Sequence, residues 1–210
     1  MRFLEEREAL LAVVKKMTAS QMIIGTWGNA SIRIPSQDMM IITPSAMDYE
    51  KMTAGDLALI SLEGELLEAV YQPSSEWKLH LNIYNRRTDA QAVVHVHSVY
   101  ASAFAAAHLT IPVALEETAQ LIGHEIKVSP YAECGSAELA ETVSKELGTD
   151  KNAVLMANHG LICLGADIAQ AWKAAQVVEK NAQIVFIAKQ LGEVHCLSQE
   201  EVRKLYWQFK

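Results

Sequence analysis

One short run, residues 92–97 (AVVHVH), constrains the fold more than any other part of the sequence. Its first residues are small or β-branched and do not alternate with polar ones, so the run predicts a strand that is buried on both faces. Such a strand needs a layer of other structure above and below it. Helical patterns are interleaved with the strand patterns on both sides of this run, which favours an α/β fold built as a three-layer α/β/α sandwich.

The rest of the chain divides into helices and short strands. Helices are expected at residues 4–20, 73–87, 99–107, 137–147, 167–191 and from 198 onward, with N-caps at Asp167 and at Ser198, where Glu201 completes a capping box. Strands are expected at residues 31–34, 39–42, 57–61, 65–69, 92–97, 111–115, 125–128, 153–156 and 161–164. Turn residues at 35–36, 44–45 and 63–64 join the early strands as hairpins, so the sheet is expected to be mixed with an antiparallel region.

Length and charge limit the class of protein. A chain of 210 residues suits one domain with a full hydrophobic core, so residues 1–210 are expected to form a single domain. The formal net charge of −7 argues against a nucleic-acid or anionic-membrane surface, because those surfaces need clustered Lys and Arg. No apolar run reaches the ~20 residues of a membrane span and the start lacks the regions of a signal peptide, so a cytoplasmic protein is expected.

Common cofactor and disulfide patterns do not occur in the sequence. The three cysteines, Cys134, Cys163 and Cys196, form no CxxC pair and are expected to be buried thiols. Neither GxGxxG nor GxxxxGK[ST] is present, so nothing signals a dinucleotide or a nucleoside triphosphate.

Three histidines are candidate metal ligands. His95 and His97 lie two apart on the predicted strand and therefore project from the same face. His159 follows another predicted strand and precedes Gly160, which permits a sharp turn. Three imidazoles without cysteine are typical of a catalytic site with an open position. The alternative interpretation of His95 and His97 is two core histidines that are hydrogen-bonded to backbone carbonyls, which would give the same strand pattern. The other four histidines, including His80, are interpreted as ordinary surface or core residues.

Small, donor-rich turns offer a place for an anion. They are found at residues 25–31, at residues 43–46 and at Ser74 and Ser75, which precede a predicted helix. Glu76 follows at the helix start, where it can interact with the helix dipole or reach a ligand held there. Together the three turns fit a phosphate site that uses neutral donors.

Five motifs give the chain a family resemblance. In order they are Gly28-Asn29-Ala30-Ser31, Thr43-Pro44-Ser45, Pro73-Ser74-Ser75-Glu76-Trp77, His95-Val96-His97-Ser98 and Asn158-His159-Gly160. Their order and spacing resemble the class II aldolase and adducin superfamily over nearly the whole chain. The resemblance implies a homotetramer of α/β/α subunits with a mostly antiparallel sheet and an active site at each subunit boundary.

The resemblance also assigns roles to residues. It places one divalent metal per subunit, Zn²⁺ or alternatively Mn²⁺ or Co²⁺, on His95, His97 and His159. Glu76 takes the place of the acid/base carboxylate, which can also bind the metal. The phosphate loops fall on six positions, namely Gly28, Asn29, Ser45, Ala46, Ser74 and Ser75.

One departure concerns the proton donor. The family's aldolases have a tyrosine shortly after an Ile-Pro pair, whereas here Ile111-Pro112 is followed by Glu116 and Glu117. Glu116 is the candidate replacement, with Glu117 as the alternative, and a solvent-facing position for these residues is the remaining interpretation. Tyr206 is the candidate for a C-terminal tyrosine that reaches the neighbouring subunit's site.

The implied activity is reversible cleavage of a small ketose 1-phosphate, of the fuculose or deoxypentulose type, to dihydroxyacetone phosphate and an aldehyde. The same metal site would also serve a sugar-phosphate 4-epimerase or a dehydratase of the methylthioribulose-1-phosphate type. A non-catalytic, adducin-like scaffold is the remaining alternative, and it is favoured less because all three histidines and Glu76 are present.

Overall fold

A computed structural model describes residues 1–34 and 37–209, so the turn expected at Pro35–Ser36 lies outside the described residues. Within those ranges, eight strands form one sheet in the order β4-β3-β2-β1-β5-β8-β7-β6. All neighbouring pairs are antiparallel except β6 and β7. The expected mixed, mostly antiparallel sheet is confirmed. The strands are β1 (Asn29–Arg33), β2 (Met39–Ile42), β3 (Ala58–Ser61), β4 (Leu66–Glu68), β5 (Ala92–Val96), β6 (Val128–Ser129), β7 (Ala153–Met156) and β8 (Gly160–Gly165).

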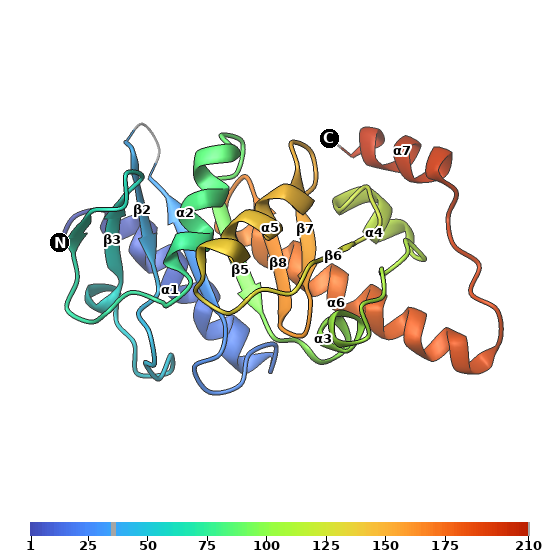
Figure 1. Ribbon diagram of the computed structural model, residues 1–210, viewed down its shortest axis with the longest axis horizontal. Coiled ribbons are helices and arrows are strands. Elements are labelled where there is room, and N and C mark those ends of the chain that lie inside the picture. Colours follow the sequence, from blue (N-terminus) through green and yellow to red (C-terminus); the bar gives the residue numbers. More distant parts are fainter. Residues whose placement is uncertain (35–36, 210) are drawn as a thin grey trace.

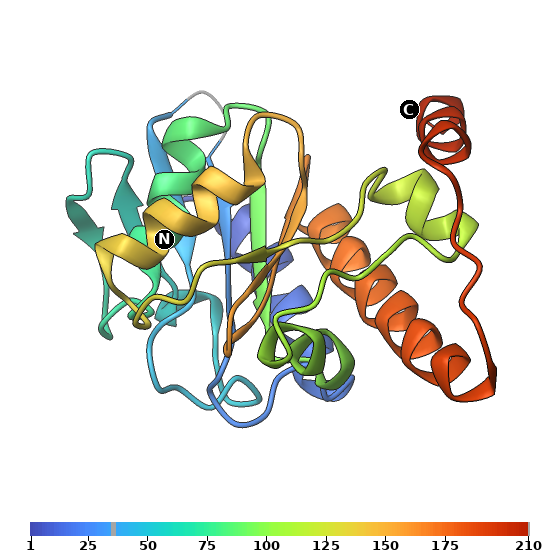
Figure 2. The same cartoon turned by 45° about the vertical axis from the view of Figure 1, so that its right-hand side comes forward.

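Helices cover both faces of the sheet, as Figures 1 and 2 show: α2 and α5 lie on one face, and α1, α3 and α6 lie on the other. The short α4 and the C-terminal α7 pack on each other at the end of the molecule away from β3 and β4. The helices are α1 (Leu4–Ala19), the 3₁₀ turn Ala54–Asp56, α2 (Trp77–Arg86), α3 (Val99–Ala106), α4 (Glu116–Leu121), α5 (Ala137–Leu147), α6 (Ile168–Leu191) and α7 (Gln199–Gln208). The three-layer α/β/α sandwich is therefore confirmed.

Strand β5 lies at the centre of the sheet and separates two hydrophobic cores. Val94 and Val96 belong to the core beneath α1, α3 and α6, whereas Val93 belongs to the core beneath α2 and α5. Because side chains alternate along a strand, His95 projects to the same side as Val93. The fold thus directs this histidine toward the layer that contains α2.

The strand expected at residues 111–115 is not formed, and this prediction was wrong. Only Ile111 makes a β-bridge, with Ile126, and α4 begins at Glu116. Pro112 has no N–H to give to a ladder. The buried Asn181 of α6 replaces a partner strand, because its Nδ2 donates to the Pro112 carbonyl (2.8 Å) and its Oδ1 accepts from the Ala114 N–H (3.2 Å).

The expected helix caps are present. The Asp167 side chain accepts from the Gln170 N–H at 2.7 Å, and Ser198 forms the capping box with Glu201. None of the helices in the described ranges combines the length and apolar character that crossing a membrane requires.

Candidate metal centre

The three candidate histidines converge at one edge of the sheet. His95 is the fourth residue of β5, His97 follows the end of that strand, and His159 lies in the turn between β7 and β8. In Figure 1 this is the lower edge, where the turn between β7 and β8 lies. The ring centroids are 4.7, 4.8 and 4.9 Å apart. One ring nitrogen of each histidine lies within 4.8 Å of the others, and the Nε2 atoms of His95 and His97 are 2.6 Å apart.

Gly160 allows this convergence, because it begins β8 directly against the end of β5. A Cβ atom at this position would lie 2.5 Å from the Val96 carbonyl oxygen and 3.1 Å from Cδ2 of His97. Any larger residue would therefore push His97 and its strand away from the turn that carries His159.

Burial keeps two of the histidines, His95 and His97, in the neutral form that binds metals. Desolvation lowers the pKa of His95 well below its usual value, and the neighbouring His97 and His159 lower it further. Desolvation, together with His159, lowers the pKa of His97 to about 4. Both rings are consequently uncharged at neutral pH, with lone pairs available to a cation.

Glu76 is the N-cap residue of α2 and points its carboxylate at the histidines. Its side chain is only 4% exposed, and its Oε2 accepts from Asn29 Nδ2 at 2.8 Å. Its Oε1 lies 3.6 Å from His159 Nε2 and has no hydrogen-bond partner among the described residues. A buried carboxylate oxygen without a partner is costly. The donor set of three imidazoles and this oxygen fits a divalent cation.

The serine-rich loops are joined beside the histidines. Pro44 and Pro73 form a β-bridge, the Ser45 N–H donates to the Gln72 carbonyl (2.8 Å), and the Ser74 N–H donates to the Thr43 carbonyl (3.0 Å). A cavity of about 80 Å³ lies between these loops and the histidines. Its lining includes all six candidate phosphate residues (Gly28, Asn29, Ser45, Ala46, Ser74 and Ser75) as well as Glu76, His97 and His159.

The structure does not bring the other two candidates into this cavity. Glu116 is exposed at the start of α4, and its neighbour Glu117 pairs with Lys180 at 2.7 Å. Tyr206 packs its ring over Gly123, where an added Cβ would lie 2.5 Å from the tyrosine ring.

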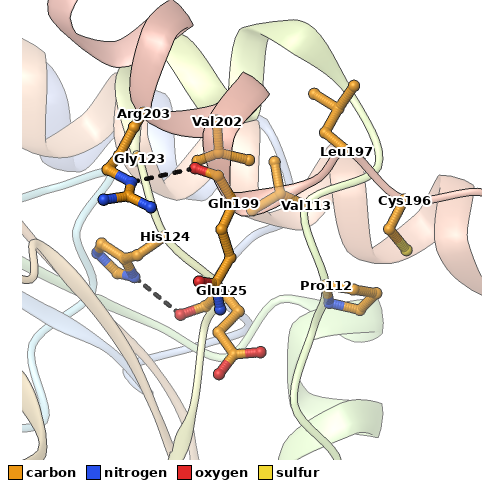
Figure 3. Close-up of a pocket in the computed structure, with 10 residues that line it drawn as sticks. All are labelled: Pro112, Val113, Gly123, His124, Glu125, Cys196, Leu197, Gln199, Val202 and Arg203. Carbon is orange, nitrogen blue, oxygen red and sulfur yellow. Dashed lines mark hydrogen bonds between the residues drawn. The ribbon is translucent and has the colours of Figure 1, made fainter.

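A separate pocket of about 370 Å³, shown in Figure 3, lies between the segment before β6 and the C-terminal segment. His124, Glu125, Gln199 and Arg203 contribute polar side chains to its lining. It contains none of the candidate metal or phosphate residues.

Two residues of the site were missed by the sequence analysis. His80, interpreted there as ordinary, is completely buried, and its Nε2 lies 2.6 Å from Asn29 Oδ1, directly behind Glu76. Cys134 lines the cavity, and partial desolvation of its thiol, together with the nearby Glu76 carboxylate, raises the pKa of that thiol to about 11. The expectation of three buried thiols was wrong for Cys134 and Cys196, which are exposed; only Cys163 is buried. No sequence pattern marks either missed residue, because both reach the site through the packing of α2 and of the loop before α5.

Comparison with known proteins identifies the family. The sequence model of the family described as "Class II Aldolase and Adducin N-terminal domain" matches residues 8–186. The chain belongs to the class II aldolase family. It is 35% identical over 206 residues to 5-deoxy-D-ribulose 1-phosphate aldolase of Bacillus thuringiensis serovar kurstaki, covering 98% of this chain and 96% of that one. It is 36% identical over 196 residues to L-fuculose phosphate aldolase of Escherichia coli K12, covering 93% and 89%.

The fold of this class II aldolase matches solved relatives. A structure of L-fuculose 1-phosphate aldolase superimposes with a TM-score of 0.94 at 31% identity, covering 98% of this chain and 96% of that one. Class II aldolases use a divalent metal, and the three histidines form a candidate ligand group for it. The chain is therefore an enzyme of the metal-dependent aldolase class.

Proposed function

We propose that this class II aldolase cleaves a small ketose 1-phosphate, reversibly, to dihydroxyacetone phosphate and an aldehyde. The observation that carries the proposal is the cavity shared by the serine-rich loops, the histidines and the unpartnered Glu76 oxygen. Relatives named for 5-deoxy-D-ribulose 1-phosphate and L-fuculose phosphate support a substrate that is phosphorylated at carbon 1.

His95, His97 and His159 would hold the metal, with Glu76 as an additional ligand when substrate is absent. Zn²⁺ is the proposed ion, because three neutral imidazoles are a donor set that suits it, and Mn²⁺ or Co²⁺ are the alternatives. When bound, the metal supplies Lewis-acid stabilisation of the negative charge that develops on the substrate's carbonyl oxygen.

The joined loops would bind the phosphate and position the ketose. Ser45, Ser74 and Ser75 offer hydroxyl donors, and Gly28, Ala46 and Ser75 offer backbone N–H groups, whereas the N–H groups of Ser45 and Ser74 already join the loops. Asn29 Nδ2 carries two hydrogens, so it can donate to the phosphate as well as to Glu76. The hydrogen bonds between the loops support a cradle that is formed before substrate arrives, which reduces the ordering cost of binding.

Glu76 is the proposed acid/base group. With Oε2 held by Asn29, its Oε1 faces the histidines and can take a proton from, and return it to, the carbon beside the substrate's carbonyl. In this proposal the two carboxylate oxygens have different tasks: Oε2, which also lies 3.7 Å from His95 Nε2, is held by Asn29, and Oε1 takes the proton.

Assembly would supply the second proton donor. Glu116 and Tyr206 lie outside the cavity of their own subunit, so each would have to act at a neighbour's cavity in the proposed homotetramer. Light scattering combined with activity measurements tests this, because a fully active monomer would exclude both roles. We also infer that residues 1–210 act as one domain and that the enzyme works in the cytoplasm.

Product analysis tests the activity. The purified enzyme, loaded with zinc, would be incubated with a panel of ketose 1-phosphates that includes fuculose, deoxyribulose and methylthioribulose forms. Release of dihydroxyacetone phosphate with an aldehyde is expected. A diketone product without dihydroxyacetone phosphate would indicate a dehydratase, and an epimeric sugar alone would indicate an epimerase.

Proton exchange tests the role of Glu76. Glu76→Gln is expected to retain metal and phosphate binding but to lose most exchange of the hydroxymethyl proton of dihydroxyacetone phosphate with D₂O, followed by NMR. Exchange at the wild-type rate would remove Glu76 from the acid/base role.

A further inference from the structure

A chain of buried hydrogen bonds leads away from Glu76 into the core. Glu76 Oε2 accepts from Asn29 Nδ2 at 2.8 Å, and Asn29 Oδ1 lies 2.6 Å from His80 Nε2. His80 Nδ1 is then 2.7 Å from Ser31 Oγ, which is in turn 2.7 Å from the Tyr84 hydroxyl. All five side chains are at most 4% exposed. They come from α2 and its N-cap and from β1, so packing of this helix on the sheet assembles the chain.

Each hydrogen bond in this chain has one possible direction. The Glu76 carboxylate can only accept, so Asn29 presents its NH₂ group to Glu76 and its oxygen to His80. The oxygen needs a donor, so His80 carries its proton on Nε2 and accepts from Ser31 at Nδ1. Tyr84 then donates to Ser31. Desolvation lowers the pKa of His80 to about 3, which agrees with a neutral ring in one fixed tautomer.

We propose that His80 is a positioning residue for the reaction: through the Asn29 amide it fixes the Glu76 carboxylate in the orientation that leaves Oε1 free toward the histidines. The inference rests on the acid/base role proposed above for Glu76. If the amide of Asn29 turned over, its oxygen would face the carboxylate and its NH₂ group would face a ring that has its own N–H. Turning the amide would therefore also require the His80 ring to change tautomer and the Ser31 and Tyr84 hydroxyls to reverse, so the buried chain as a whole opposes it.

A purely structural role for His80 would have different consequences. It would change the stability of the protein, with no specific effect on turnover of bound substrate. The positioning role predicts a fall in kcat much larger than any rise in KM, because His80 bonds to one phosphate-site residue, Asn29, whereas the serine-rich loops are held by hydrogen bonds of their own.

The experiment compares His80→Leu with His80→Gln, in which the glutamine amide can still donate to Asn29. Exchange of the hydroxymethyl proton of dihydroxyacetone phosphate with D₂O is measured by NMR on zinc-loaded wild type and variants. His80→Leu should lower kcat for exchange about 10- to 100-fold, as loss of supporting contacts typically does, while KM and zinc content stay within about twofold. His80→Gln should recover to within about threefold of wild type. Metal-free crystals of His80→Leu should show that Glu76 has left its contact with Asn29.

Several results would overturn the inference. The first is a His80→Leu enzyme that exchanges the proton at the wild-type rate. The second is a kcat in His80→Gln that is as low as in His80→Leu. If His80→Leu does not fold, Ser31→Ala is measured in its place. Because this variant removes the group that fixes the His80 tautomer, its kcat for exchange should fall by at least about threefold. An unchanged kcat would refute the proposal. A wild-type enzyme that exchanges no proton would instead refute the proposed function of Glu76, so the two failures are distinguishable.

Discussion

Replacement of Gly160 by alanine tests whether the contact between β8 and β5 sets the metal centre. The new Cβ would lie 2.5 Å from the Val96 carbonyl oxygen, about 0.9 Å inside the 3.4 Å at which ordinary contact begins. The obstacle is backbone on the central strand, so it cannot be relieved by turning a side chain. Overpacking of this kind costs roughly 1–3 kcal/mol, which corresponds to a melting temperature lower by roughly 2–12 °C for a chain of this size.

The same substitution should weaken the metal site. His97 Cδ2 is 3.1 Å from the new Cβ, so the ring must move away from His95 and His159. We expect zinc affinity to fall by about 10- to 100-fold, which is the range seen when the surroundings of metal ligands are disturbed. Calorimetry of the metal-free protein measures the first effect, and competition with a chromogenic chelator measures the second.

Gly192→Ala is the matched control. No atom lies within 4 Å of a Cβ at that position, so the variant should melt and bind zinc like the wild type. A Gly160→Ala protein that melts within about 1 °C of wild type and binds zinc equally well would refute the reasoning, since the calculated overlap predicts a shift of at least about 2 °C.

Three further predictions follow from the site and the core. His97→Ala should lose stoichiometric zinc and activity yet remain folded, as elemental analysis and circular dichroism would show. The pKa of His80 is about 3 in the folded state and about 6.5 in the unfolded state. Below pH 6.5 the unfolded chain therefore binds a proton at His80 that the native state does not bind. The free energy of unfolding of the metal-free protein, measured by urea titration, should fall as pH drops from 6.5. In His80→Gln the slope of that free energy against pH should be smaller, by up to about one proton taken up on unfolding. Asn181→Ala should cost roughly 2–3 kcal/mol in urea unfolding, because it leaves two buried backbone groups unpaired, whereas Gln183→Ala on the exposed face of α6 should cost less than about 0.5 kcal/mol.

The sequence was sufficient for elements whose signals are local. Hydrophobic periodicity and caps predicted α5 at residues 137–147 and the long α6 after Asp167, and the apolar run at 92–96 predicted the central strand. The His95–His97 pair could be predicted to share a face because strand alternation follows directly from backbone geometry. Each of these inferences depends only on residues close together in the chain.

Features that depend on distant packing could not be predicted in this way. The segment after Ile111 has the composition of a strand, but Asn181, about 70 positions later, supplies its hydrogen bonds. His80 lies in a helix pattern like any other histidine, and only the packing of α2 against β1 brings it to Asn29. No local pattern in the sequence likewise places Glu116 and Tyr206 outside the lining of the cavity.

The three candidate metal ligands come from the end of β5 and from the turn before β8, which are more than 60 positions apart in sequence and adjacent in the sheet. Two histidines on one strand form an incomplete site, so a chain that has not yet paired Val96 with Leu161 offers at most two of the three imidazoles. We therefore expect metal binding at this candidate site to follow formation of the central sheet during refolding. A zinc-sensitive dye in a stopped-flow experiment would then report when β5 pairs with β8. Far-UV circular dichroism does not isolate this late folding event, because helices dominate that signal.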